Sequence, residues 1–277
     1  MMRTYSISRW AGIVLLGLTI GCQTTQADPN AGEAAVARAL SGKAVWEEKC
    51  RSVAGEKIYR KVENVEGVLL MKVRPMRGER EWADRMWPGA AFAREAPGEE
   101  YIKNFLGYEY GFSTLENKSI PVTPKYRGTI STDRLPGGRP GYRWVEIIDE
   151  KDGQRYRYTG RYEEPWQNDK THLKGYIKFF LDKTPAPNPS PRYGVTYEDH
   201  VIPEDRYLGI ASSTIKVLDL QTKEVLGEMT RYAWSPGAPS RVNPSPWLTA
   251  YRCPDQAWTG ADTRKFVDQI LIPAKEK

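Results

Sequence analysis

Polar and apolar side chains alternate along residues 155–162 (RYRYTGRY), with arginine and tyrosine at successive positions. In a β-strand, successive side chains point to opposite faces of the sheet. An apolar run precedes this segment at residues 142–148 (YRWVEII), and Asp152-Gly153 between the two runs is a hairpin turn signal. We therefore predict a β-hairpin with one arginine face and one tyrosine face. The arginine face holds Arg155, Arg157 and Arg161, and the tyrosine face holds Tyr156, Tyr158 and Tyr162.

A second pair of β-type runs, residues 206–220 and 224–234, flanks the short turn at residues 221–223. Both runs carry apolar residues on both faces, which indicates strands in the centre of a sheet or a β-bulge. Segments rich in β-branched and aliphatic residues predict further strands. These strands span residues 57–62, 67–73, 173–181 and 248–253.

Helical periodicity is limited to short segments. Residues 30–40 combine an asparagine cap with helix formers and end near Gly42, and residues 99–106 hold a second short helix. Residues 262–272 place apolar side chains on one stripe of a C-terminal helix, which Pro273 ends. Strands and helices do not alternate regularly, which argues against a doubly wound parallel sheet. The expected fold class is α+β, mainly antiparallel β in a sandwich or open barrel-like sheet, with a few short helices including a C-terminal one.

The N-terminus has the three parts of an export signal. Arg3 and Arg9 form a positively charged leader, and an apolar run follows at residues 10–20. This run is shorter than the roughly 20 apolar residues that span a bilayer. A basic leader, a short apolar core and a small-residue end are typical of a removable signal peptide.

The end of this signal, residues 18–22 (LTIGC), resembles the lipobox of bacterial lipoproteins. Thr19 departs from the pattern, because that class has an aliphatic residue there. The resemblance implies that residues 1–21 are removed and that Cys22 is acylated, which anchors the chain to a membrane of the cell envelope. Gln23, in place of aspartate, favours the outer membrane facing the periplasm if the host is Gram-negative.

The remaining chain divides into a tether and a body. Residues 22–32 are polar and predict a lipidated flexible tether, and residues 33–277 predict a single β-rich globular domain. The proline-rich run at residues 184–191 (TPAPNPSP) is a candidate sub-boundary inside this domain. The hairpin sequence LDLQTKEVL and the C-terminal Cys-Pro pair resemble uncharacterised proteobacterial envelope lipoproteins. That resemblance implies no particular activity.

The three cysteines of the chain support export to an oxidising compartment. Acylation of Cys22 leaves Cys50 and Cys253, and an exported protein favours their pairing. We predict a Cys50–Cys253 disulfide, with two separate buried thiols as the alternative. Redox catalysis is not expected, because the chain has no C-x-x-C spacing.

Composition argues against several functions. The formal net charge falls from +6 to +4 when Arg3 and Arg9 leave with the signal, and the charges are mixed in sign. Nucleic-acid binding needs a clustered basic face, so nucleic acid is not an expected partner.

Only two histidines, His172 and His200, are present, so the chain has few candidate residues for a zinc site or a catalytic triad. His200 follows Glu198-Asp199, and we interpret this segment as a solvated acidic turn. Ser213 and Lys216 match an S-x-x-K motif, but in a predicted strand they point to opposite faces. We predict no metal, no cofactor and no assignable catalytic residue.

The aromatic residues offer a candidate binding surface, because tyrosine and tryptophan bind sugar rings and protein partners well. The tyrosine face together with Trp166 would form an aromatic stripe, and the arginine face would meet phosphate or carboxylate groups. The alternative is an ordinary half-buried strand, with the tyrosines in the core and the arginines solvated.

We therefore expect a non-enzymatic envelope lipoprotein that binds a protein or glycan partner, or that acts in assembly. The alternative is an envelope or cell-wall glycan hydrolase. That alternative requires two carboxylates facing each other across a cleft, about 5–10 Å apart.

Overall fold

The computed structural model describes residues 31–107, 140–172, 174, 178–254 and 260–274. Cys22, the export signal and the tether up to residue 30 lie outside the described residues. The strands are β1 (Gly55–Ile58), β2 (Val62–Val65), β3 (Gly67–Leu70), β4 (Trp144–Ile148), β5 (Arg155–Glu163), β6 (Lys178–Pro185), β7 (Tyr193–His200), β8 (Ile210–Asp219), β9 (Glu224–Trp234), β10 (Tyr251–Cys253) and β11 (Leu271–Pro273). The helices are α1 (Ala31–Ser52), α2 (Glu79–Ala83), η1 (Pro88–Phe92), α3 (Gly98–Leu106), η2 (Pro165–Gln167), α4 (Pro203–Tyr207) and α5 (Asp262–Val267), where η denotes a 3₁₀ helix.

Within the described residues, nine strands form one large sheet in the order β1-β9-β8-β7-β3-β4-β5-β6, with β10 also pairing β9. Most pairs are antiparallel, but β3 pairs in parallel with both β4 and β7. The α+β fold class with a mainly antiparallel sheet is confirmed. The strands β6 and β7, on either side of the proline-rich run, belong to this same sheet.

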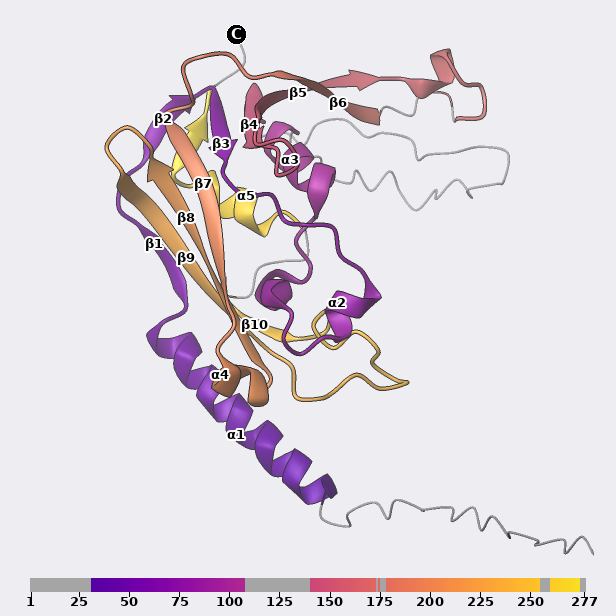
Figure 1. The fold of residues 1–277 in the computed structure, drawn as a ribbon, viewed down its shortest axis with the longest axis vertical. Helices are drawn as coiled ribbons and strands as arrows, with labels where there is room; N and C mark the ends of the chain where they lie inside the picture. The colour runs from indigo at the N-terminus through magenta and orange to yellow at the C-terminus, as the bar shows by residue number, and fades with distance from the viewer. Residues whose placement is uncertain (1–30, 108–139, 173, 175–177, 255–259, 275–277) are drawn as a thin grey trace, which may run out of the picture.

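The main core lies between one face of this sheet and the segments η1, α3 and α5 (Figure 1). Helix α3 faces the core with Tyr101, Ile102 and Phe105, at the spacing of a helical stripe. The sheet contributes alternate side chains, as expected when one face is buried. Core residues from the sheet include Val145, Tyr197, Ile215, Met229 and Ala233.

Both predicted hairpins are present. In the β4–β5 hairpin, Glu146 lies opposite Arg157, and Gly153 in the turn has the positive φ of 69° that favours glycine. The β8–β9 hairpin is central in the sheet and its register shifts between Val217 and Leu218. Apolar residues on both faces of this hairpin therefore reflect both a central position and a bulge.

Helix α1 is twice as long as predicted, because Gly42 does not end it. A side chain at Gly42 would meet the carbonyl oxygen of Leu208 at 2.3 Å, so glycine here permits close packing of the helix on the chain before β8. The predicted C-terminal helix is too long, since α5 ends at Val267 and Leu271–Pro273 forms a strand parallel to β2. The apolar residues of this segment therefore belong partly to helix α5 and partly to strand β11.

Other boundaries also differ from the predictions. Residues 57–62 contain the end of β1 and the start of β2, and the strand predicted from residue 206 begins only at Ile210, after α4. Strand β6 extends to Pro185, inside the predicted proline loop. Proline is tolerated there because β6 is an edge strand of the sheet.

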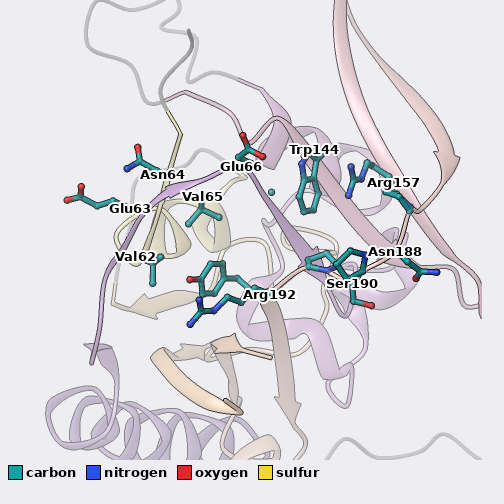
Figure 2. A pocket seen from close by; sticks show the side chains of 15 residues that line it. Val62, Glu63, Asn64, Val65, Glu66, Trp144, Arg157, Asn188, Ser190 and Arg192 are labelled. Carbon is teal, nitrogen blue, oxygen red and sulfur yellow. The ribbon is translucent and has the colours of Figure 1, made fainter. Parts of the chain in front are cut away.

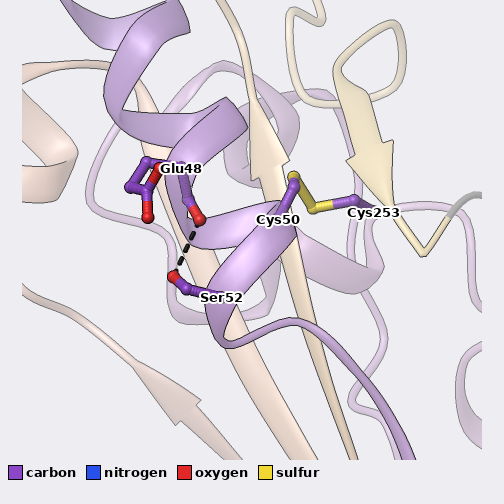
Figure 3. The surroundings of a disulfide bond; sticks show 4 residues. All are labelled: Glu48, Cys50, Ser52 and Cys253. Carbon is purple, nitrogen blue, oxygen red and sulfur yellow. Dashed lines mark hydrogen bonds between the residues drawn. A yellow bond between two sulfur atoms is a disulfide. The ribbon is translucent and has the colours of Figure 1, made fainter.

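A disulfide joins Cys50 on α1 to Cys253 at the end of β10, as Figure 3 shows. Their Cα atoms are 5.7 Å apart and 203 residues separate them in sequence. Beside this bond, Trp46 stacks on Trp234 with ring centroids 6.1 Å apart, and Tyr251 packs against both rings. This second cluster holds α1 against the face of β8 and β9 that lies opposite the main core.

Candidate functional site

An open groove of about 520 Å³ lies between the β2–β3 segment and the chain that enters β7 (Figure 2). One wall is formed by residues 62–67 and the other by the proline segment, residues 187–191, with the start of β7. We call this the Trp144 groove. Trp144 and Arg157 also line the groove, and the polar or aromatic side chains of the second wall are Asn188, Ser190, Arg192 and Tyr193.

Trp144 is fixed between a strand and an arginine. It lies opposite Gly67 in the parallel β3–β4 pair, and a side chain at Gly67 would come within 2.2 Å of the indole. Gly67 thus lets the ring lie close against β3. The Arg157 guanidinium carbon is 4.0 Å from the centre of the ring, a cation–π contact. Both contacts order the half-buried indole, and Figure 2 shows Trp144 and Arg157 side by side.

Beneath Arg157 lies a fully buried carboxylate, Glu146. Arg157 donates two hydrogen bonds to its Oε1, from Nε at 3.0 Å and from Nη2 at 2.8 Å. Nε of Arg155 lies 2.8 Å from the other oxygen, Oε2. The interpretation of these two arginines as merely solvated is therefore wrong, because they neutralise a buried acid from the neighbouring strand.

Arg155 also holds the proline segment in place. Its guanidinium donates to the carbonyl of Pro187 at 2.5 Å, to Oδ1 of Asn188 at 3.2 Å and to the hydroxyl of Ser190. These bonds link a wall of the groove to β5 through one side chain. The groove is therefore shaped before any ligand arrives.

Arg192, at the other end of the groove, repeats the arrangement of Arg157. It donates to the buried Asp219 from Nε at 3.0 Å and from Nη2 at 2.9 Å, and Arg60 donates to the same oxygen at 3.2 Å. The bond from Arg192, aided by backbone N–H groups of Thr222 and Gln221, lowers the pKa of Asp219 to about 2. Both groove arginines are thus paired with buried carboxylates.

The acids of the groove lie on one wall only. Glu63 and Glu66 come from the β2–β3 segment, and Glu66 is paired with Arg143. The facing wall, residues 187–193, contributes no carboxylate among the described lining residues. Glu95 and Asp262 interact electrostatically, but both are buried and neither lines the groove. The groove therefore lacks the facing acid pair of a glycosidase.

The structure separates the predicted arginine and tyrosine surfaces. Tyr158 is buried in the core, and Tyr156 is half-buried, with its hydroxyl donating to Asp152 at 2.8 Å. Trp166, in η2, lies under Lys170, whose Nζ is 3.5 Å from the ring centre. The Tyr162 side chain lies outside the described residues. Tyr156, Tyr158 and Trp166 do not line the Trp144 groove.

Of the predicted arginine face, only Arg157 lines the groove, and Arg155 supports its wall. Arg161 instead pairs with Asp182 and Glu163, away from the groove. Sequence reasoning missed Trp144 and Arg192. The Asp152-Gly153 turn carried a usable signal, since its register places Glu146 opposite Arg157.

The histidines and the S-x-x-K motif show no catalytic arrangement among the described residues. His200 ends strand β7, not an acidic turn, and its Nε2 lies 3.0 Å from the Thr214 hydroxyl. Ser213 is buried in β8 and accepts a hydrogen bond from Arg74. The described part of the chain contains no group of three or more histidine, cysteine or acidic side chains arranged to hold a metal.

Comparisons with protein-family models, with curated proteins and with solved structures find no match to this chain. No helix within the described residues is long and apolar enough to cross a membrane.

Proposed function

We propose that this protein is a lipid-anchored binding protein of the cell envelope, and that the Trp144 groove binds an uncharged polar ligand, a glycan strand. One observation carries the proposal for the groove: each of its two arginines is held in place in advance by a buried acid. Because Arg157 and Arg192 each use Nε and Nη2 for that pairing, the Nη1 atoms remain as oriented donors.

The shape and chemistry of the groove suit a glycan. A volume of about 520 Å³ falls within the usual range of ligand sites. Arg157 and Arg192 supply donors, Asn188 and Ser190 supply amide and hydroxyl groups, and Trp144 and the prolines supply apolar edges. Sugars present hydroxyl groups beside C–H surfaces, so such a mixed lining complements them. A wall already held by Arg155 reduces the entropy lost on binding.

The proposed location in the cell envelope rests on the lipobox-like segment and is supported by the disulfide. A Cys50–Cys253 bond is stable in an oxidising compartment such as the periplasm. Lipidation of Cys22 would hold the domain at the membrane, and the outer membrane is favoured if the host is Gram-negative. A binding domain on such an anchor would attach the membrane to a nearby glycan.

Co-sedimentation of the purified protein with insoluble cell-wall sacculi tests the groove. Arg192→Gln removes one oriented donor, while Arg60 and two backbone N–H groups still bind Asp219. We expect affinity for sacculi to fall by about tenfold, the effect of losing one good polar contact. Trp144→Leu, which leaves Arg192 in place, should weaken binding similarly.

The matched controls are Arg161→Gln and Trp166→Leu, which alter the same residue types outside the groove. Both should bind sacculi as the wild type does. If the controls lose binding and the groove variants retain it, the predicted stripe near η2 is the site and the groove is not. If no variant and no wild-type protein sediments with sacculi, the glycan proposal is wrong.

A further inference from the structure

A second pocket, smaller and less open than the groove, lies between η1 and strand β7. Its volume is about 150 Å³, and it shares no lining residue with the Trp144 groove. We call it the Arg77 pocket. Its lining residues are Arg74, Pro75, Arg77, Trp87, Pro88, Gly89, Phe92, Tyr197 and Asp199.

The charges on this lining do not balance. Arg74 is 2% exposed and donates to Asp199 at 2.7 Å and to Ser213 at 3.3 Å, while its Nε has no hydrogen-bond partner among the described residues. Arg77 is half-buried, and no described carboxylate lies within ion-pair distance of it. Its buried Nε has no described partner either. The lining thus holds two guanidinium groups and one carboxylate, and that carboxylate is paired with Arg74.

Aromatic rings form the rest of the lining. The Arg74 guanidinium carbon is 3.5 Å from the centre of the Tyr197 ring and 4.6 Å from that of Phe92. Arg77 lies 5.8 Å from the centre of the Trp87 ring. The pocket thus combines cationic donors with apolar walls, which suits a ligand with an anionic head and an apolar body.

Arg77 is thus a half-buried cation without an ion pair to a described carboxylate. Buried cations are normally paired, because removing an unpaired charge from water is unfavourable. Burial, and then repulsion by Arg74, lower the pKa of Arg77 to about 10, against the weaker attraction of Glu95 and Asp199. An anion bound between the two arginines would supply the missing partner.

We propose that the Arg77 pocket binds a small carboxylic acid with an aromatic or similarly compact apolar body. Arg77 would hold the carboxylate through its fork of N–H groups, a geometry suited to carboxylates. Trp87 and Phe92 would pack on the body. The volume of about 150 Å³ is close to that of a cavity known to hold benzene, so a single ring fits. This site is separate from the proposed glycan groove and does not depend on it.

Fluorine NMR titration of the full-length protein in detergent, with para-fluorobenzoate as the probe, tests the proposal. We expect saturable binding, and at least about tenfold weaker binding of para-fluorobenzamide, which has the same ring without the charge. Arg77→Gln should weaken binding of the acid by about tenfold or more, as expected for a lost charged hydrogen bond. Arg77→Lys should recover part of the affinity, because it restores the charge without the fork.

Arg80→Gln is the matched control, because Arg80 is exposed on α2 and does not line the pocket. It should bind para-fluorobenzoate as the wild type does. Three results would overturn the proposal: no saturation below about 10 mM, equal binding of acid and amide, or equal loss in the Arg77→Gln and Arg80→Gln variants. Thermal unfolding of each variant establishes that it is folded.

Discussion

At the scale of single residues, several buried charges pair with an opposite charge on the same or an adjacent element. Glu146 of β4 pairs with Arg157 of the adjacent strand β5, and Asp219 of β8 pairs with Arg192, which directly precedes the adjacent strand β7. Arg264 is 3% exposed and pairs with Asp268 through Nε at 2.6 Å. Arg264 also donates to carbonyls at the end of α3, where a cation is favoured by the helix dipole.

Glu95 is the acid for which burial has the clearest consequence. It is 1% exposed, and its carboxylate accepts the backbone N–H of Thr263 at 3.1 Å. Burial, followed by repulsion from Asp262, raises the pKa of Glu95 to about 7, against the opposing effects of Arg74 and Arg231. The folded state therefore binds this proton more tightly than the unfolded state does.

We predict that Glu95 makes folding less favourable as pH rises from about 4.5 to 7. Relative to Glu95→Gln, which cannot ionise, the free energy of unfolding of the wild type should fall by roughly 2–3 kcal/mol between pH 5 and pH 8. Urea denaturation at both pH values measures this difference. Glu79→Gln, a change of an exposed acid on α2, should follow the wild type. A wild-type curve parallel to that of Glu95→Gln would contradict the account.

At the scale of elements, local patterns predicted hairpins well and helix ends poorly. A hairpin is specified by alternating side chains and turn residues that lie close together in sequence. The pattern of residues 155–162 therefore predicted β5 directly. Helix α1 continues through Gly42, where the helix packs closely against Leu208, a residue far away in sequence. Likewise, Leu271 joins β2 as a strand although its apolar spacing is helical. Such tertiary contacts leave no local signal.

The candidate site shows the same limit. Arg155 and Arg157 were identified from alternation alone, and both contribute to the Trp144 groove. Arg192 and the proline segment form the groove only because β3 and β7 are parallel neighbours. No spacing rule links residues 62–67 to residues 187–193. The Arg77 pocket was likewise invisible, since it joins the chain before α2 to β7.

The disulfide connects the first helix to the end of the sheet, and we predict a large effect of its removal. Replacing Cys50 and Cys253 together by serine should lower the free energy of unfolding by roughly 4–5 kcal/mol, because a loop of 203 residues is released in the unfolded chain. Denaturant titration of the oxidised wild type and the double variant measures the change. If the two have equal stability, the bond contributes nothing, and the packing of Trp46 against Trp234 and Tyr251 is enough to hold α1.

At the scale of the whole molecule, one sheet joins the segments before and after the proline-rich run. Figure 1 places the β5–β6 hairpin at one end of the molecule and α1 at the other. A helix of 22 residues rises about 33 Å, and its outer turns expose Val36 and Leu40. Its first residue, Ala31, follows the proposed lipid site by nine positions, so α1 would lie nearest the membrane.

Mass spectrometry of the mature N-terminal peptide, purified from the membrane fraction, tests the anchoring most directly. We predict a chain that begins at Cys22 and carries a diacylglyceryl group, often with a further acyl chain on its amine. Cys22→Ala should lose the acyl mass and leave the membrane fraction. An unmodified Cys22 thiol, or a Cys22→Ala protein that fractionates as the wild type does, would contradict the proposal that this protein is a lipoprotein.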